Sequence, residues 1–551
     1  MRVSRTKAAV AVSAALALVA TAAGCSSSSD DEGSGKSSDG TVNIEWSEPE
    51  NPLVPANTTE TQGGKIIDAL FTGLISYAPK DGATVNEMAE DIKGDATFKT
   101  YTVKLKSGWT FHDGTPVTAE SFVKAWNYNA YSPNGMANGT FFADIAGYDK
   151  TWTDDPDADG PQKPATPAAK ELSGLKVVDE TTFTVELAAP SKVWPVKIGY
   201  TAFSPLPNVF FDKGAAEYAK NPIGNGPFKY KARTVNTSLT VTRFDEYKGR
   251  EKPKVKDVLF KVYQDDEAAY NDVQSGNLDF QQQVPISALA GEKYKTDMAD
   301  RYVDGEVSTS QFVAFPFYRN EFKDIRVRRA ISLAIDRDLI VKTIFSGTRK
   351  PMTGFVNPRV AGYVPDQCGE WCKFDAAKAK ALLAEAGGFK GEPMSIAYNA
   401  DRGGHKDWTT AVCNSINKTL GVPCTPRAIP TFDEFRTLSD DKKHVSMYRA
   451  AWQADYPLSE NWLNPLYRTG ASSNDGAYTN AALDAKLKEA DGTSDTDAAN
   501  KLYAEAEKIV VEDMPVVPLW NYAQQAAYSD KVENVVIDTF GELQLAELSL
   551  K

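Results

Sequence analysis

The sequence predicts an α/β fold with several lobes, because short strands and helices are mixed along the whole chain of 551 residues. Apolar residues alternate along strand-like stretches, as at Tyr101, Val103 and Leu105, and the same period returns near Phe183. Apolar residues at helical spacing mark other stretches, as over 325–345. A chain of this length can form two or three domains with cores of their own.

Several helices have recognisable start or stop signals. Thr118 can cap one helix, and Asp324 precedes the helical stretch that follows it. Asp375 opens an alanine-rich helix that should stop at Gly387-Gly388, a normal left-handed terminus. By contrast, 153–169 is rich in Asp, Pro and Gly and is expected to form a surface insertion.

Residues 1–24 are typical of a secretory signal peptide. Three basic residues precede a small, apolar run over 8–23, which is too short to span a bilayer. Small residues directly before Cys25 indicate lipoprotein processing with the lipid on Cys25, although Ala22 stands where such signals usually have Leu. The segment therefore predicts export and a lipid anchor on the extracytoplasmic face of the cell membrane. Ordinary cleavage beside an unmodified Cys25 is the alternative.

Residues 25–42 are expected to form a flexible tether. Over 26–40 the chain contains only Ser, Asp, Gly, Glu and Lys, which leaves nothing to bury. A tether is useful only when one end is held, which favours the lipid anchor. No later apolar run approaches membrane-spanning length, so the rest of the chain is expected to be soluble.

Four cysteines remain once Cys25 is set aside, namely Cys368, Cys372, Cys413 and Cys424. An even number in an exported chain favours disulfides, for which three connectivities exist. Cys413 lies on a helical stretch and Cys424 opens the strand-like stretch after it, which favours Cys413–Cys424 and leaves Cys368–Cys372. A zinc site is the alternative, but C-x3-C with a distant pair is poor zinc spacing.

Charge and missing motifs narrow the function. A net charge of −13 argues against a nucleic-acid ligand. The three histidines, His112, His405 and His444, are far apart, and no HExxH, nucleophile elbow or phosphate loop occurs. The stretch 155–160 copies half of a calcium loop, but its twelfth position is Thr166 instead of Glu. The missing motifs lower the expectation of an enzyme without excluding one, and the sequence indicates no metal, cofactor or catalytic residues.

Five stretches in family order resemble the family 5 extracellular solute-binding proteins, importer components that include oligopeptide, dipeptide and nickel binders. They are FKTYTVKLKSGWTFHDGTPVTAESFVKAW at 98–126, GNGPFKY at 224–230, QSGNLDF at 274–280, DIRVRRAISLAIDRDLIV at 324–341 and KAKALLAEAGG at 378–388. The first joins an alternating strand, an aromatic-x-D-G-T-P turn and a capped helix. Each motif alone is moderately specific, whereas five in order are highly specific.

The resemblance implies a two-lobed periplasmic-binding-protein-like fold (type II, cluster C) with an extra subdomain in the first lobe. A hinge between the lobes lets them close over a ligand. The implied boundaries are 43–71, 189–310 and 526–551 for lobe one, 72–188 for the extra subdomain and 311–525 for lobe two. Such a protein is not an enzyme, and as a monomer it passes its ligand to the permease and ATPase subunits of an ABC transporter.

Two segments, YNADRGGHK at 398–406 and YRAAWQADY at 448–456, resemble ligand segments of the oligopeptide binders. By this resemblance Asp455 holds the free amino group of a peptide, and the main chain at Trp452 and Gln453 pairs with the peptide as an added strand. Such pairing reads every peptide alike, because all peptides present the same N–H and C=O pattern. The alternative for Asp455 is a turn cap or an ion pair.

The same resemblance places four more residues at the ligand. Arg449 and His405 match basic residues that meet the peptide's carboxylate, and Phe432 matches an aromatic in a side-chain pocket. Thr61 falls near the facing strand from lobe one. The alternatives are a structural ion pair for Arg449, a surface position for His405 and a core position for Phe432.

Two departures leave the preferred peptide length open. Basic positions that oligopeptide binders use for other ligand lengths appear here as Phe345 and as Ser439 or Asp440. A dipeptide, nickel chelate, siderophore, sugar or signalling peptide is the alternative ligand, although only His405 is well placed for nickel. An extracellular hydrolase and an adhesive lipoprotein are alternatives from other classes.

Overall fold

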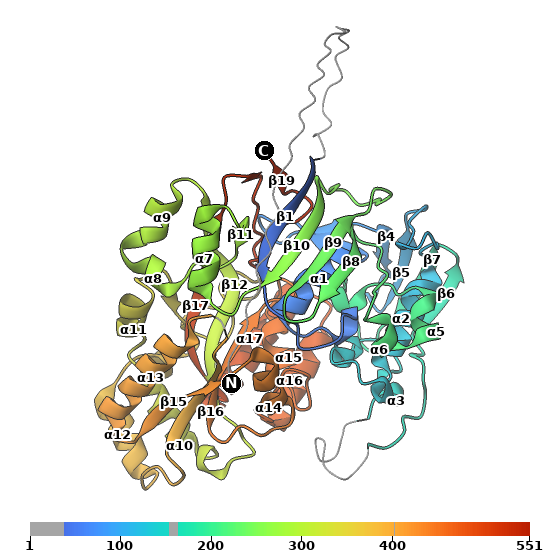
Figure 1. Ribbon diagram of the computed structural model, residues 1–551. Helices are drawn as coiled ribbons and strands as arrows, with labels where there is room; N and C mark the ends of the chain where they lie inside the picture. Colours follow the sequence, from blue (N-terminus) through green and yellow to red (C-terminus); the bar gives the residue numbers. More distant parts are fainter. Residues whose placement is uncertain (1–37, 154–163, 402) are drawn as a thin grey trace, which may run out of the picture. The chain divides into compact units, whose positions relative to one another are not determined.

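A computed structural model describes residues 38–153, 164–401 and 403–551 (Figure 1). The expected signal peptide, the expected lipid attachment at Cys25 and the calcium-like stretch at 155–160 lie outside the described residues. No helix in the described part of the chain is both long and apolar enough to cross a membrane.

The expected tether ends earlier than residue 42. Strand β1 (Ser38–Trp46) begins four residues before that point, and Thr41 and Val42 pair with Asp257 and Val258 of β10 (Val255–Val262). Val42 is fully buried. The tether boundary was wrong because Thr41 and Val42 are the first residues of the strand's alternating pattern.

An 11-stranded sheet forms the frame of the described structure (Figure 1), in the order β15-β14-β16-β12-β17-β11-β1-β10-β9-β8, with β13 paired to β17. Its further strands are β8 (Phe228–Thr234), β9 (Ser238–Arg243), β11 (Phe280–Gln281), β12 (Tyr302–Ala314), β13 (Lys350–Pro351), β14 (Met394–Asn399), β15 (Cys424–Ile429), β16 (Met447–Gln453) and β17 (Val516–Tyr528). The long antiparallel pair β12 and β17 joins the two ends of the sheet.

A second sheet, of four strands, has the order β4-β5-β7-β6 and lies within the predicted extra subdomain. Its strands are β4 (Ala89–Gly94), β5 (Thr100–Leu105), β6 (Leu175–Asp179) and β7 (Thr182–Glu186). Helix α2 (Ala119–Ala130) covers it, with Trp126 and Phe183 in edge contact at 5.6 Å between ring centres. Thr118 and Ser121 form the capping box of α2, as the start signal predicted.

The helix expected over 325–345 is two helices. Asp324 caps α10 (Ile325–Leu333), and Asp336 caps α11 (Arg337–Ile344) through the N–H of Leu339 at 3.0 Å. The prediction of one helix was wrong because apolar residues keep their spacing across the break.

The alanine-rich helix was predicted correctly. Asp375 caps α12 (Ala376–Glu385), and Gly387 and Gly388 have φ values of 78° and 81°, which suit glycine.

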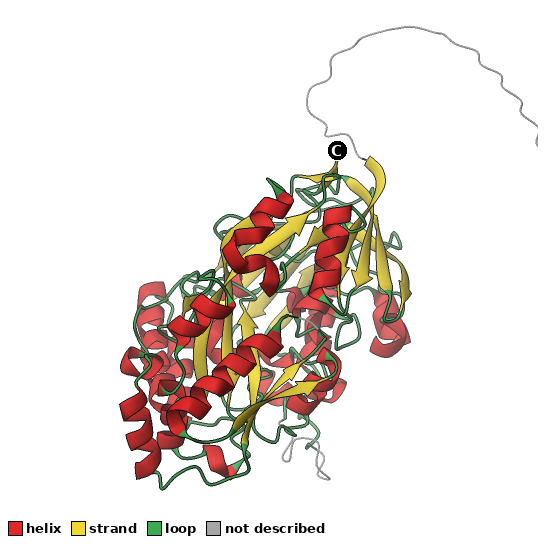
Figure 2. Ribbon diagram, turned by 60° about the vertical axis from the view of Figure 1, so that its left-hand side comes forward, coloured by secondary structure: helices red, strands yellow, loops and turns green. Residues whose placement is uncertain are grey.

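Helices flank the strands of the large sheet (Figure 2). The remaining helices are α1 (Thr61–Leu70), α3 (Tyr148–Thr151), α4 (Trp194–Lys197), α5 (Asn208–Lys213), α6 (Ala215–Tyr218), α7 (Asp266–Ser275), α8 (Ile286–Leu289), α9 (Lys293–Met298), α13 (His405–Leu420), α14 (Phe432–Asp440), α15 (Glu460–Tyr467), α16 (Ala481–Asp491) and α17 (Thr496–Asp513). The short strands β2 (Ile75–Tyr77), β3 (Thr84–Asn86), β18 (Val532–Glu533) and β19 (Ser549–Leu550) complete the regular structure.

Buried apolar side chains form two large clusters. One contains the small sheet together with β1 and β8–β10, and the other contains Trp408, Trp462 and Trp520. Side chains of α7–α9, which were expected in lobe one, belong to this second cluster. The lobe boundaries themselves stay a prediction.

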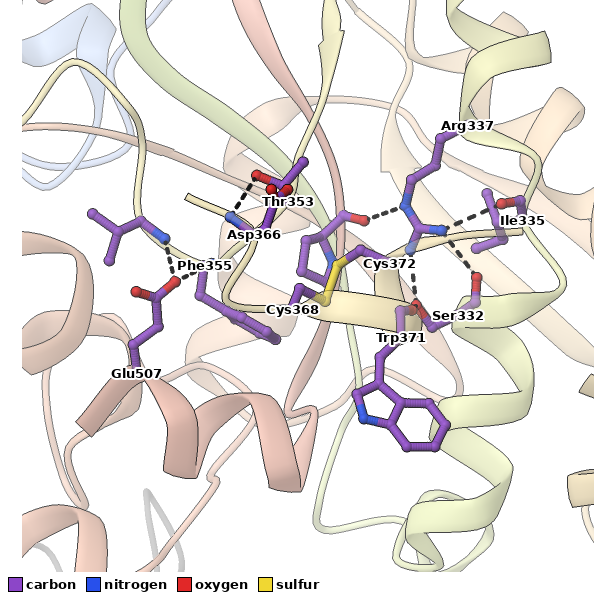
Figure 3. The surroundings of a disulfide bond; sticks show 12 residues. Ser332, Ile335, Arg337, Thr353, Phe355, Asp366, Cys368, Trp371, Cys372 and Glu507 are labelled. Carbon is purple, nitrogen blue, oxygen red and sulfur yellow. Dashed lines mark hydrogen bonds between the residues drawn. A yellow bond between two sulfur atoms is a disulfide. The ribbon is translucent and has the colours of Figure 1, made fainter. Parts of the chain in front are cut away.

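The four cysteines form the two disulfides favoured from the sequence. Cys368–Cys372 and Cys413–Cys424 have Cα–Cα distances of 5.7 and 4.9 Å. Because all four sulfur atoms are in disulfides, the alternative of a zinc site is wrong. The first bond lies beside Trp371, whose carbonyl accepts a hydrogen bond from Ser332 at 2.6 Å (Figure 3).

Removing Cys413–Cys424 should destabilise the fold more than removing Cys368–Cys372, because its loop is longer. The sequence separation is 11 for Cys413–Cys424 and 4 for Cys368–Cys372. In the chain-entropy picture the free energy of unfolding falls by about 3 kcal/mol for the double Cys413→Ala, Cys424→Ala variant and by about 2 kcal/mol for the other pair. Guanidinium unfolding measures both. An equal or reversed order would contradict the loop argument.

Candidate functional site

A cavity of about 690 Å³ is lined by all seven residues predicted to contact a ligand. These residues are Thr61, His405, Phe432, Arg449, Trp452, Gln453 and Asp455. The walls come from distant parts of the chain: α1 near one end, β16 and the start of α14 in the later half, and the segment 538–546 near the C-terminus.

Asp455 follows β16 and is held by one side chain. The Asp455 N–H donates to Asn461 Oδ1 at 2.8 Å, and Asn461 Nδ2 donates to Asp455 Oδ2 at 2.8 Å. Trp452 Nε1 also donates to Asn461 Oδ1, at 3.2 Å, so the fully buried Asn461 fixes both residues. Within the described residues, Asp455 Oδ1 has no hydrogen-bond or ion-pair partner, so one carboxylate oxygen is available.

Burial raises the pKa of the Asp455 carboxyl group to about 7. Glu460 raises the pKa further, whereas the hydrogen bond from Asn461 and the charge of Lys197 lower it. The alternative ion pair with Arg449 is absent from the described residues. A cation beside Asp455 would favour its ionised form, so the position suits an ammonium group.

The cavity-facing edge of β16 has no strand partner in its second half. β12 pairs with β16 from Tyr448 to Gln453, whereas β14 pairs only with Met447 and Tyr448. Among the described strands, none pairs with the other edge beyond Tyr448. An extended chain can therefore add to this edge.

The alternation of the strand identifies the free main-chain groups. The Ala454 N–H donates to Ser308 of β12 at 2.9 Å, so the main-chain groups of Ala451 and Gln453 are directed to the other edge. The main chain of Trp452 is directed to β12, and its partly exposed side chain lines the cavity instead. The main chain of Gln453 is therefore free to pair with a peptide, as expected. The second free main-chain position is Ala451 and not Trp452, which was expected.

Arg449 lies six residues before Asp455, near the start of this edge. Its Nε donates to Asn399 Oδ1 at 2.6 Å, and its guanidinium carbon lies 5.6 Å from the ring centre of Phe432 and 5.2 Å from that of Phe435. Burial lowers the pKa of Arg449 to about 10, which leaves it charged at neutral pH. No ion pair of Arg449 occurs within the described residues, so the structural alternative is wrong there.

His405 is the first residue of α13, and the surface position considered for it is wrong because it is 9% exposed. Its Nδ1 accepts a hydrogen bond from Trp408 Nε1 at 3.0 Å. Burial, followed by the charges of Arg449 and Arg349, lowers the pKa of His405 well below its usual value. It is therefore a neutral group and not the cation that the resemblance implied.

Thr61 and Phe432 each begin a helix. Thr61 is the exposed first residue of α1, and the described structure has no strand at this position. Glu60, whose backbone is extended, caps that helix. Phe432 is half-buried at the start of α14, and its N–H donates to Asp401 Oδ2 at 2.9 Å.

The two positions that depart from the family's basic residues face other side chains. Phe345 is fully buried, and Ser439 forms a hydrogen bond with His444 Nε2 at 2.9 Å. Arg349, which no sequence motif indicated, does line the cavity.

An acidic wall near Gln453 was also missed from the sequence. Gln453 Nε2 donates to Glu542 Oε1 at 2.8 Å, and Asp68, Asp538 and Lys65 line the same cavity. Burial, together with the neighbouring carboxylates, raises the pKa of Asp68 to about 8 and that of Asp538 to about 7. Among the described residues there is no group of three or more His, Cys, Asp or Glu side chains that could hold a metal ion.

The chain is similar in sequence to known binding proteins. The family model described as "Bacterial extracellular solute-binding proteins, family 5 Middle" matches residues 83–474. The periplasmic murein peptide-binding protein MppA of Escherichia coli is 28% identical over 480 residues, which are 85% of each chain. The periplasmic oligopeptide-binding protein OppA of Salmonella typhimurium is 28% identical over 473 residues, 82% of each chain.

Solved structures share the fold. The E. coli murein tripeptide binding protein MppA has a TM-score of 0.82 at 24% identity, covering 93% of this chain and 98% of that one. Haemophilus influenzae OppA in complex with RPPGFSPFR has a TM-score of 0.82 at 22% identity, covering 93% and 99%. These likenesses confirm the predicted two-lobed α/β fold.

Proposed function

The chain belongs to the bacterial extracellular solute-binding proteins, family 5, and we propose that its ligand is a peptide bound in extended form in the cavity beside β16. Proteins of this family are binding components of ABC importers and not enzymes. The chain is therefore a solute-binding protein. The names of its relatives, which include periplasmic oligopeptide- and murein peptide-binding proteins, support a peptide ligand.

The observation that carries the proposal is the unpaired edge of β16, which ends at the available oxygen of Asp455. A peptide added to this edge would use the main-chain groups of Ala451 and Gln453, whatever its sequence. Its ammonium group would then meet Asp455, and its carboxylate would meet Arg449. The peptide would run antiparallel to β16.

The distance between these two anchors limits the ligand. Asp455 is six positions after Arg449 in the sequence, so their Cα atoms lie at most about 21 Å apart. The long arginine side chain shortens the remaining span. Peptides of about three to five residues fit such a span at about 3.3 Å per residue.

We also propose how the protein takes part in transport. The protein is exported and held at the extracytoplasmic face of the cell membrane by a lipid on Cys25. As a monomer it captures a peptide, closes its two lobes and passes the peptide to the permease, while separate subunits hydrolyse ATP. Side-chain pockets with ordered water would let one site accept many sequences.

Calorimetry with matched peptides tests the proposal. Alanine peptides of three to five residues should bind with a free amino group and bind at least about 100-fold more weakly when N-acetylated, because Asp455 then loses its cation. Mass spectrometry of small molecules released from freshly purified, denatured protein should find peptides. Equal binding of the free and acetylated forms, or release of a non-peptide solute only, would refute the proposal.

A further inference from the structure

Arg349 is a buried cation that contributes to the cavity wall. It lies between α11 and β13, is 6% exposed and lines the same cavity as Arg449. Its guanidinium carbon lies 3.7 Å from the ring centre of Phe345 and 3.9 Å from that of Tyr522. Two aromatic rings therefore hold the guanidinium, while its N–H groups stay in the guanidinium plane and remain able to donate.

Two other buried arginines in the described part of the chain form a hydrogen bond from every side-chain nitrogen. Arg337 is 3% exposed and donates to the carbonyls of Pro518 at 2.7 Å and Ser332 at 3.0 Å (Figure 3). Arg328 is 4% exposed and donates to the carbonyls of Phe322 and Asp513 at 2.7 and 2.6 Å.

Arg349 differs from both. Its Nη1 has no hydrogen-bond partner within the described residues and no ion pair reaches its side chain there, and its one hydrogen bond to a side chain goes to Tyr522. A buried charge is costly unless it is paired. The pattern is that of a site whose partner comes from the ligand.

Arg349 lies at the end of the cavity where Arg449 lies. The charges of Arg449 and Arg349 both lower the pKa of His405, and the side chain of Tyr522 raises the pKa of both arginines. His405 is neutral, so it adds no charge to theirs. The carboxylate of Asp401 raises the pKa of Arg449, but its two oxygens already accept hydrogen bonds from Asn399 and Phe432. This end of the cavity therefore presents two guanidinium groups to a ligand.

We propose that Arg349 binds a second carboxylate at the carboxyl end of the ligand, so that the protein prefers peptides ending in Glu or Asp. The inference rests on the proposed function, in which Arg449 meets the terminal carboxylate. The planar fork of Arg349 suits a carboxylate that approaches in its plane. Phe345, which stands where a basic residue was expected, supplies one of the rings that position this arginine.

Peptides that differ by one charge test the inference. Alanine peptides of three to five residues ending in Glu or in Gln have nearly the same shape, and calorimetry on the full-length protein should show about 10- to 100-fold tighter binding of the Glu form. In Arg349→Met the preference should fall below about threefold, with little change for the Gln form. Arg349→Lys keeps the charge without the fork and should give an intermediate preference.

Arg449→Met is the matched control, because it should weaken the Glu and Gln peptides by similar factors. Thermal unfolding checks that every variant folds, and the wild-type comparison of the two peptides needs no variant. Equal affinity of the wild-type protein for both peptides would overturn the inference, as would Arg349→Met weakening both alike. If no peptide binds the wild-type protein, the proposed function itself is wrong and the inference falls with it.

Discussion

Asp455→Ala should lower the affinity for peptides with a free amino group by about 100- to 5000-fold, since removing one partner of a buried ion pair costs about 3–5 kcal/mol. Asp455 suits this role because Asn461 holds one carboxylate oxygen and the other has no partner among the described residues. Calorimetry with an alanine tripeptide measures the change.

Asp455→Asn is the matched variant for this experiment, because it keeps the shape of the side chain and removes only the charge. In wild-type protein the free peptide should bind far more tightly than its N-acetylated form. In Asp455→Asn this difference should nearly vanish. A variant that still discriminates between the two forms would show that another acid, such as one from the wall near Gln453, holds the amino group.

The pH dependence of binding follows from the same carboxyl group. Burial raises the pKa of Asp455 to about 7 in the free protein, so protonation competes with the ammonium group below that pH. Affinity should therefore be highest between about pH 7 and pH 8, where the carboxyl group is ionised and the peptide's amino group is still protonated, and fall by about tenfold per pH unit below pH 7. Asp68 and Asp538 line the same cavity, and their pKa values are also raised, to about 8 and about 7. The difference between wild type and Asp455→Asn isolates the part that belongs to Asp455.

Local signals in the sequence were enough for much of the fold. Thr118, Asp324 and Asp375 mark helix starts because a short polar side chain caps free N–H groups, and this interaction involves only neighbouring residues. The break between α10 and α11 was missed because the apolar spacing continues across it. The assignment of α7–α9 to one core or the other depends on long-range packing, which no local pattern reports.

The candidate site shows the same division. The seven residues predicted from the family resemblance all line one cavity. The resemblance could identify them because it carries information on tertiary structure that sequence spacing alone lacks. Asn461 and Arg349 were missed since their importance arises from what they contact: Asn461 from Asp455, and Arg349 from two rings far apart in sequence. One signal for Arg349 was available. It is an arginine four residues after Phe345, the position where a basic residue was expected and an aromatic stands.

Lys197→Met should destabilise the fold by about 3–5 kcal/mol, because Lys197 is the cation of a buried charge network. Its Nζ lies 2.8 Å from Asp144 and 3.6 Å from Glu460, and the Lys197 and Glu460 side chains are 9% and 8% exposed. Methionine keeps the length of the stem but removes the cation in contact with both carboxylates, and the nearby Arg468 pairs with Asp491 instead. Guanidinium unfolding at pH 8 measures the loss.

Lys220→Met is the control for this prediction. Lys220 pairs with Glu217 at 2.5 Å, but their side chains are 72% and 59% exposed, so solvent screening should leave the free energy of unfolding of this variant nearly unchanged. A similar loss in both variants would mean that burial does not decide the outcome.

The Lys197 network also reaches the ligand site, which gives the variant a second readout. Lys197 lowers the pKa of Asp455, and Glu460 raises it. Removing the cation should therefore move the fall in peptide affinity to higher pH. In the variant Glu460 can accept a proton in the folded state, so the loss of stability should be larger at pH 8 than at pH 6. If the variant is less stable but the pH dependence of peptide affinity is unchanged, Lys197 does not influence the pKa of Asp455.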